Sequence, residues 1–206
     1  MKRVTALLLA AMMIITTGLI TPAMAAEDDV PETYSNAYVV MDAKTGQVLL
    51  QKNMYEKEYP ASITKILTTA LGLTYAKPED RITVSQETVS DVWKWGETTH
   101  LALEPGEIIT LKDALYGAMV ESANDCANAI AQAVSGSLTD FAELMNQQVA
   151  ALGLSDTHFT NAHGLPDKDH YTTAYDMARI TRWAMTVPGF EEYFCATEYT
   201  IPKTNK

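Results

Sequence analysis

Ser62 and Lys65 lie three residues apart in the segment Ser-Ile-Thr-Lys, where an almost wholly apolar run to Tyr75 begins. In a helix this spacing places the hydroxyl and the amine on one face. A serine becomes a good nucleophile only when a base takes its proton, and a lysine acts as that base only when burial or nearby positive charge lowers its pKa. The apolar run supplies the burial, so the pair could carry nucleophilic catalysis. The alternative is a serine helix cap beside a lysine that extends to the surface, since Ser-x-x-Lys is common by chance.

A second candidate pair is Ser122 and Asn124, in a break between two predicted helices, with Ser122 60 residues after Ser62. The hydroxyl of Ser122 could relay a proton between the lysine and a leaving amine, and the Asn124 amide could hydrogen-bond a substrate peptide group. The backbone N–H of Ser62, at a helix N-terminus, could donate to an oxyanion. The alternative is that the break only caps the following helix, for which Asp125 is the expected residue.

The elements that must position these residues follow from pattern and capping signals. Residues 36–53 predict a strand, a turn and a strand, with Gly46 where a hairpin tolerates positive φ. An apolar helix is expected from about Ser62 to Tyr75, and short strands or extended loops flank a polar insertion that holds Trp93 and Trp95. Further helices are expected from Thr110, capped with Asp113; from about Asp125 to Val134, ending at Gly136; from near Thr139 to Gly153; and from Thr173, capped with Asp176, to before Pro188.

Length and composition fit a secreted domain. The chain has 206 residues, 47% of them hydrophobic, which allows one domain with a sizeable core. Residues 1–25 combine a basic start, an apolar stretch and a small-x-small site at Ala23-Met24-Ala25, which is typical of a signal peptide. An uncleaved membrane anchor is the alternative, and either leaves residues 26–206 outside the cytoplasm. The net charge of −11 argues against a nucleic-acid partner.

Two other groups of residues are weaker candidates. Cys126 and Cys195 have no metal-ligand spacing, and two separate packed thiols are favoured over a disulfide between them. His158, His163 and His170 share one loop-rich stretch that could hold a metal or part of a Ser-His-Asp triad. Neither is favoured, because the chain has no His-Glu-x-x-His and no Gly-x-Ser-x-Gly. Trp93 and Trp95 could touch a glycan or a peptide, or simply pack in a surface loop.

Ser-x-x-Lys followed by Ser-x-Asn is the pattern of penicillin-binding proteins and serine β-lactamases. The segments "YPASITKILTTALGL", "LYGAMVESANDCANAIAQAVSGS" and "FAELMNQQVAALGLSDTHFTNAHGLPDKDHYTTAYDMARI" resemble one branch of them, the low-molecular-weight D-alanyl-D-alanine carboxypeptidases. The resemblance runs from about Asn36 to the C-terminus. It implies an α+β fold of the serine β-lactamase and DD-peptidase type, with a helical cluster packed on an antiparallel sheet.

The resemblance also implies roles for individual residues. Ser62 would be the acylated nucleophile and Lys65 its proton acceptor, with Ser122 as a further catalytic residue and Asn124 as a substrate-binding residue. The substrate would be a peptidoglycan stem peptide ending in D-Ala-D-Ala, from which the terminal D-Ala is released. No metal or organic cofactor is implied, and β-lactams should acylate Ser62. A β-lactamase is less favoured, since no deacylation glutamate segment is identifiable.

The third sequence block of that family, a Lys-Thr/Ser-Gly triplet on a strand, follows Ser-x-Asn. Here the only such triplet, Lys44-Thr45-Gly46, precedes Ser62, at the tip of the predicted hairpin, where turn chemistry explains it. We therefore expect residues 26–206 to be an incomplete catalytic domain that lacks the C-terminal strands and any accessory domain or membrane anchor. Such a chain should fold poorly or work weakly. The alternative function is a truncated or non-catalytic homologue that only binds peptidoglycan or penicillin.

Overall fold

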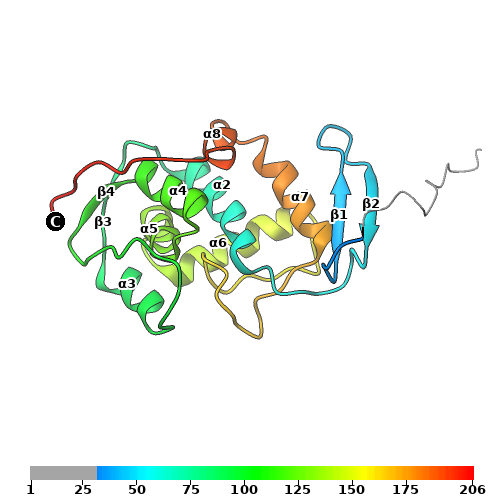
Figure 1. The fold of residues 1–206 in the computed structure, drawn as a ribbon, viewed down its shortest axis with the longest axis horizontal. Coiled ribbons are helices and arrows are strands. Elements are labelled where there is room, and N and C mark those ends of the chain that lie inside the picture. The colour runs from blue at the N-terminus through cyan, green and yellow to red at the C-terminus, as the bar shows by residue number, and fades with distance from the viewer. Residues whose placement is uncertain (1–31) are drawn as a thin grey trace, which may run out of the picture. The chain divides into compact units, whose positions relative to one another are not determined.

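Two apolar helices, α2 (Lys65–Tyr75) and α5 (Asn124–Ser135), pack directly on each other in the middle of the fold (Figure 1). Gly72 permits their close approach, because a Cβ at this position would lie only 2.9 Å from the Ile130 side chain. The structure is a computed structural model that describes residues 32–206. The expected signal peptide at residues 1–25 lies outside the described residues.

Four more helices surround this pair. They are α3 (Gln86–Trp93), α4 (Leu111–Val120), α6 (Leu138–Ala151) and α7 (Ala174–Ala184). One buried cluster joins α4 to α5 and includes Leu115 and Ile130, and a second joins α2, α5, α6 and α7 and includes Leu71, Phe141 and Met145. Burial of so much apolar surface around α2 and α5 fixes the first turns of both helices, where the candidate catalytic residues lie.

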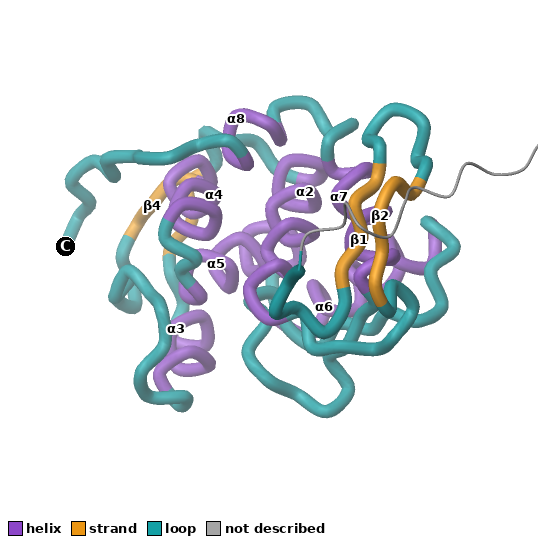
Figure 2. Tube along the Cα trace, turned by 45° about the vertical axis from the view of Figure 1, so that its right-hand side comes forward, coloured by secondary structure: helices purple, strands orange, loops and turns teal. Residues whose placement is uncertain are grey.

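The strands form two small antiparallel sheets (Figure 2). In the first, β1 (Tyr38–Met41) pairs with β2 (Val48–Lys52), which confirms the predicted hairpin, and Gly46 has the expected positive φ of 77°. In the second, β3 (Arg81–Thr83) pairs with β4 (Ile108–Thr110). Within residues 32–206, β1 pairs with β2 alone. A mainly apolar groove of about 340 Å³ runs between β1 and α7.

The helix ends agree with most of the capping signals. Thr110 and Asp113 form a capping box, Thr173 accepts from the Asp176 N–H, and Gly136 ends α5 with a positive φ of 77°. The prediction that Asp125 caps α5 is wrong. The helix begins after Ala123 without a side-chain cap, and the Asp125 carboxylate instead accepts from the backbone N–H groups of Leu101 and Leu103.

Two helices lie where the sequence predicted none. The polar insertion contains α3, which Ser85 caps by accepting from the Thr88 N–H, and a short α8 (Phe190–Phe194) follows Pro188. The apolar face of α3 consists of only Val89 and Val92, and the other positions are mostly polar. The hydrophobic pattern is therefore too weak to predict a helix from the sequence. Beyond α8 the chain runs over α4 towards β4 (Figure 1). On the way, the Tyr199 hydroxyl donates to Asp113 of α4 (2.9 Å).

Both cysteines are free thiols, which confirms the expectation that they do not form a disulfide. Cys126 is buried as expected, but the prediction that Cys195 is packed is wrong, because it is exposed after the end of α8. None of the helices within residues 32–206 has the length and apolar character needed to cross a bilayer.

Candidate active site

Ser62 and Lys65 lie on one continuous helical segment that begins as a tighter turn than predicted. Residues Ala61–Thr64 form a 3-10 turn, η2, which leads directly into α2 at Lys65. Ser62 is exposed, whereas Lys65 is 2% exposed. The Lys65 Nζ lies 3.3 Å from the Ser62 Oγ. The predicted spacing therefore does place a buried amine against an accessible hydroxyl.

The Lys65 amine has four oxygen neighbours. Two are close, the Asn124 Oδ1 at 2.8 Å and the backbone carbonyl of His163 at 2.9 Å. The hydroxyls of Ser62 and Ser122 are both 3.3 Å away. No carboxylate is among these neighbours, and burial lowers the pKa of Lys65 to about 8. Much more of the amine is therefore neutral near neutral pH than in an ordinary lysine, which a general base requires.

Ser122 occupies the turn between α4 and α5 in a strained conformation. Its φ of 59° lies in the left-handed region, which costs a non-glycine residue roughly 1–2 kcal/mol. The turn is held by two backbone hydrogen bonds, from the Ala123 N–H to Gly117 and from the Asn124 N–H to Thr99. This conformation directs the Ser122 hydroxyl to Lys65, while Asn124, the first residue of α5, brings its amide to the same amine.

A loop between α6 and α7 closes the site from the other side. The Thr68 hydroxyl donates to the Ala162 carbonyl (2.7 Å), and His170 donates from Nε2 to the Thr64 Oγ1 (2.9 Å) because its Nδ1 accepts from the Thr160 N–H. Burial lowers the pKa of His170 to about 4, so this ring stays neutral. These bonds fasten residues 160–170 along one face of η2 and α2, which places the His163 carbonyl on Lys65.

Gly164 is required where this loop meets η2. Its φ is 91°, and a Cβ there would overlap the carbonyl group of Ala61. Ala61 is itself left-handed, with a φ of 49°. The backbone of Gly164, which has no Cβ, therefore packs directly against the strained backbone of Ala61, the residue before Ser62.

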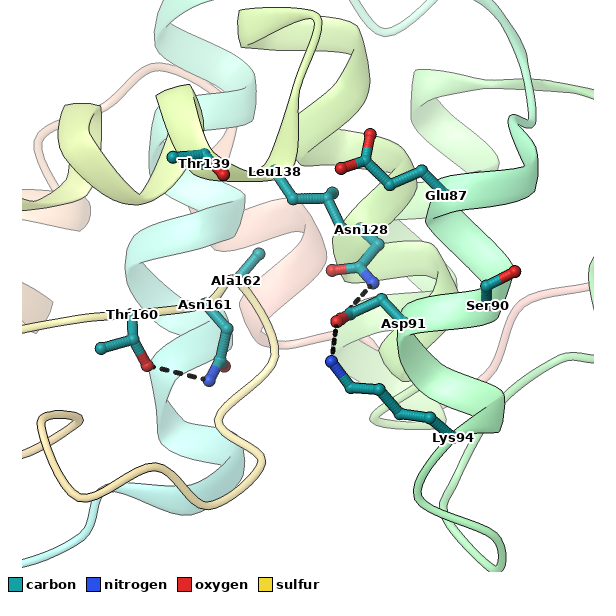
Figure 3. A pocket seen from close by; sticks show the side chains of 10 residues that line it. All are labelled: Glu87, Ser90, Asp91, Lys94, Asn128, Leu138, Thr139, Thr160, Asn161 and Ala162. Carbon is teal, nitrogen blue, oxygen red and sulfur yellow. Dashed lines mark hydrogen bonds and ion pairs between the residues drawn. The ribbon is translucent and has the colours of Figure 1, made fainter.

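The His163 ring points away from Lys65 and towards α3. Its Nδ1 accepts from the Leu165 N–H (3.0 Å), so its Nε2 carries the proton and donates to the Asp91 Oδ2 (2.9 Å). Burial lowers the pKa of His163 despite the neighbouring carboxylate, and the hydrogen bond from His163 holds the pKa of Asp91 well below its usual range. Figure 3 shows Asp91 between Asn128 and Lys94 on the wall of a pocket of about 400 Å³.

The structure thus brings together all four predicted site residues, Ser62, Lys65, Ser122 and Asn124, at one amine. It does not bring the three histidines together, and no group of three metal-ligating side chains exists in the described part of the chain. The side chains of Trp93 and Trp95 are 47% and 43% exposed.

Lys44, Thr45 and Gly46 form a tight turn outside this constellation. Asp42 accepts from the Thr45 N–H and hydroxyl, and Arg182 of α7 donates to the carbonyls of Ala43 and Lys44. These contacts agree with the expectation of a structural turn. Sequence reasoning missed the contributions of the His163 carbonyl and of Asp91. The segment Phe-Thr-Asn-Ala-His-Gly-Leu carries only a family resemblance, and a backbone carbonyl leaves no signature in a sequence.

Comparisons with known proteins agree with this geometry. The family model described as D-alanyl-D-alanine carboxypeptidase, peptidase S11, matches residues 23–205. The chain is 36% identical over 192 residues to the D-alanyl-D-alanine carboxypeptidase DacF of Bacillus subtilis, covering 88% of this chain and 47% of that protein. It is 31% identical over 183 residues to DacA of Escherichia coli, covering 84% and 44%. The chain therefore spans about half the length of the curated relatives it matches.

Solved structures of penicillin-binding proteins have the same fold. Penicillin-binding protein 6B of Escherichia coli superposes with a TM-score of 0.79 at 28% identity, over 90% of this chain and 60% of that one. Penicillin-binding protein 5 of Haemophilus influenzae gives 0.76 at 29% identity, over 84% and 51%. The α+β class and the fold type expected from the sequence are confirmed.

Proposed function

The chain belongs to the D-alanyl-D-alanine carboxypeptidase family, and from this premise we propose that Ser62 attacks the carbonyl of the penultimate D-Ala of a peptidoglycan stem peptide. A bond forms between the Ser62 Oγ and the carbonyl carbon, the peptide C–N bond breaks, and the terminal D-Ala leaves with a proton on its amine. Water then hydrolyses the acyl-enzyme. The observation that carries the proposal is the buried amine of Lys65, with its lowered pKa, beside the exposed Ser62.

The geometry around Lys65 suits a base. A neutral amine has two N–H groups, and the two short contacts, to Asn124 and the His163 carbonyl, use both of them. The remaining lone pair then faces the two hydroxyls at 3.3 Å. Lys65 can therefore accept the Ser62 proton, and Ser122 can pass a proton from the lysine to the leaving amine.

Charge that develops on the substrate carbonyl needs donors. Ser62 lies in the first turn of η2, where backbone N–H groups have no partner within the helix. Its own N–H can therefore donate to the oxygen of the substrate carbonyl. The Asn124 amide lies at the edge of the same constellation and could hold a substrate peptide group through its nitrogen. This mechanism uses no metal and no organic cofactor.

The same serine should react with β-lactams, whose strained amide presents a comparable carbonyl. We further propose that the domain works outside the cytoplasm, where peptidoglycan lies, and that a signal peptide in residues 1–25 directs it there. Membrane attachment of the protein is also part of this proposal.

A second candidate function is binding without turnover. In this function an acyl-enzyme forms and persists, or only a non-covalent complex with peptidoglycan or penicillin forms.

Labelled penicillin and a stem-peptide mimic ending in D-Ala-D-Ala test the proposal together. The native chain should acquire one label, located at Ser62 by peptide mapping, and release D-Ala, whereas Ser62→Ala should do neither. Ser155→Ala, at another exposed serine, is the matched control and should behave as native. Equal D-Ala release from native protein and Ser62→Ala would exclude the serine mechanism. Labelling without D-Ala release would support the binding function.

A further inference from the structure

Asp91 is linked to the Lys65 amine through a single intervening residue, although it lies on a different helix from every predicted site residue. The first link is the hydrogen bond from the His163 Nε2–H to the Asp91 Oδ2, at 2.9 Å. The second is the hydrogen bond from the Lys65 Nζ to the His163 carbonyl, also at 2.9 Å. The side chain and the backbone of His163 thus bind partners on opposite sides of the loop.

We propose that Asp91 is a positioning residue for Lys65, which fixes the His163 ring and thereby holds the His163 carbonyl on the lysine amine. The inference rests on the role proposed above for Lys65. It adds a residue that the sequence motifs do not include, on helix α3, which the sequence did not predict.

The carboxylate is itself held in place. Asn128 of α5, one helical turn after Asn124, donates to the Asp91 Oδ2 (3.1 Å), and Lys94 pairs with the Oδ1 (Figure 3). Asn128 also donates to the Thr88 carbonyl in α3. The Asp91 carboxylate, which accepts from His163, is therefore held in a fixed position relative to α5. The same helix carries Asn124, the other close partner of Lys65.

Both ring nitrogens of His163 are used, so the ring orientation is determined. The Leu165 N–H donates to Nδ1, and Nε2 donates to Asp91. The ring is 2% exposed, and without Asp91 a buried N–H would lose its acceptor. The ring would then turn towards water in the adjoining pocket, and the carbonyl that belongs to the same residue would shift with it.

The consequence for catalysis concerns the direction of the lysine lone pair. With the His163 carbonyl in place, two acceptors occupy the N–H groups of a neutral Lys65 and the lone pair faces Ser62. If the carbonyl shifts, one N–H can turn to the Ser62 Oγ instead, and water can reach the amine. Hydration favours the protonated amine, so less of it is available as a base.

The groups that can titrate around this amine are few. The Cys126 thiol of α5 is buried, which raises its pKa, and the His163 ring is neutral because burial lowers its pKa. Asp91 of α3 and Lys94, the residue that follows this helix, form an ion pair beyond that ring. Ser62, Ser122, Asn124 and the His163 carbonyl complete the surroundings of the amine, so a change in its titration after substitution of Asp91 would come through His163.

The test compares Asp91→Ala and Asp91→Asn with Glu87→Ala. Glu87 lines the same pocket, one turn earlier on the same helix, and is not hydrogen-bonded to His163, so it controls for loss of a negative charge there. Asp91→Ala should slow acylation by labelled penicillin about 10- to 100-fold, with the non-covalent dissociation constant unchanged. The pH at which acylation reaches half its maximal rate should rise, so that the difference in rate from the native chain becomes smaller at high pH.

The other two variants are the controls. Asp91→Asn, whose amide oxygen can still accept from His163, should recover most of the rate, and Glu87→Ala should match the native chain.

Nuclear magnetic resonance separates this inference from the proposed function, because it needs no substrate. The 13Cε resonance of Lys65 should titrate at higher pH in Asp91→Ala than in the native chain, and the His163 ring in the native chain should carry its proton on Nε2. An unchanged Lys65 titration, or a uniform loss of rate at every pH, would overturn the inference even if penicillin labels Ser62 well. Failure of the native chain to be labelled would defeat the proposed function and leave these resonances to decide the role of Asp91.

If Asp91→Ala does not fold, the native chain and Asp91→Asn still decide the question. The Nε2-bound proton of His163 should resonate downfield in the native chain and move upfield in Asp91→Asn, because an amide is a weaker acceptor than a carboxylate. A His163 ring protonated on Nδ1 in the native chain would contradict the inference directly.

Discussion

The Nζ of Lys65 and the Oδ1 of Asn124 lie 2.8 Å apart, although 59 residues separate them in the chain. Each stands in the first turn of its helix, and α2 and α5 pack on each other along their lengths. The contact between the two side chains therefore depends on helix packing rather than on a flexible loop. It supplies Lys65 with an acceptor that carries no charge. A carboxylate there would raise the pKa of the amine, whereas with the neutral amide the lowering by burial prevails.

Replacement of Asn124 should change both the rate and the pH dependence of acylation. Asn124→Ala removes a short hydrogen bond to Lys65 and should slow acylation roughly 10- to 100-fold, since such bonds contribute about 1.5–3 kcal/mol. Asn124→Asp is nearly isosteric but places a carboxylate beside the amine, which raises the pKa of Lys65. Its acylation should need a higher pH than that of the native chain, as a rate profile with labelled penicillin would show. Identical profiles for Asp and Asn at this position would contradict the assigned contact.

Acylation of the native chain should rise with pH through about 8 and then level off. The pKa of Lys65 is lowered to about 8 by burial, and only the neutral amine can take the Ser62 proton. Lys65→Arg keeps a positive charge that cannot be removed in this range, so it should lose about 10²–10⁴ in rate at every pH. A flat native profile between about pH 6.5 and 9 would show that Lys65 is not the base.

The sequence predicted the parts of the site that depend on spacing along one helix or on a recognisable break. Ser62 and Lys65 follow helical geometry, and Ser122 and Asn124 occupy a break marked by polar residues between apolar runs. The caps at Thr110 and Thr173 were also predictable, because a hydroxyl and the N–H three residues later are set by local geometry.

The remainder depends on tertiary contacts that have no local pattern. Asp91 and His163 are 72 positions apart, and the residues around each give no indication that it contacts the other. The type and position of Asp125 predict a cap for α5, yet the backbone N–H groups of Leu101 and Leu103 compete for its carboxylate. The hydrogen bonds to these distant N–H groups replace the cap that the local sequence favours, and they cannot be predicted from the residues around Asp125 alone.

Gly164→Ala should destabilise the chain and slow acylation. A Cβ at this position would overlap the Ala61 carbonyl group, next to Ser62, and the backbone φ of 91° is unfavourable for alanine. Gly153→Ala is a matched control, because Gly153 also has a positive φ, 69°, but no atom lies within 4 Å of the place its Cβ would take. Urea unfolding should show a loss of about 1 kcal/mol for Gly153→Ala and of about 2–4 kcal/mol for Gly164→Ala, since overpacking adds to the backbone cost. Only Gly164→Ala should alter acylation; equal effects of the two substitutions would argue against close packing at Ala61.

Stability should fall as the pH drops from about 6.5 to 4. Burial lowers the pKa of His170 to about 4 from an ordinary 6.5, so in this window the unfolded chain binds a proton that the folded chain excludes. The contribution of His170 is fully present above about pH 6.5 and is lost by about pH 4, with a magnitude of up to about 3 kcal/mol. His163 is shifted in the same direction and adds to the slope. Urea unfolding of His170→Gln across this range should show a shallower pH dependence than the native chain, and an unchanged slope would exclude His170 as a source.

Lys44→Ala should leave acylation within about twofold of the native rate, because a residue of the hairpin turn has no contact with the reacting groups. The contacts of this turn with Asp42 and Arg182 are made by backbone groups and the Thr45 hydroxyl, not by the Lys44 side chain. Arg182→Ala, by contrast, removes donors to the carbonyls of Ala43 and Lys44 and should lower stability by about 1–2 kcal/mol while the acylation rate per folded molecule stays the same. Thermal unfolding and penicillin labelling of the two variants, side by side, measure both quantities. A large loss of labelling in Lys44→Ala would reinstate Lys44-Thr45-Gly46 as the functional triplet, against both its order in the chain and its place at a turn.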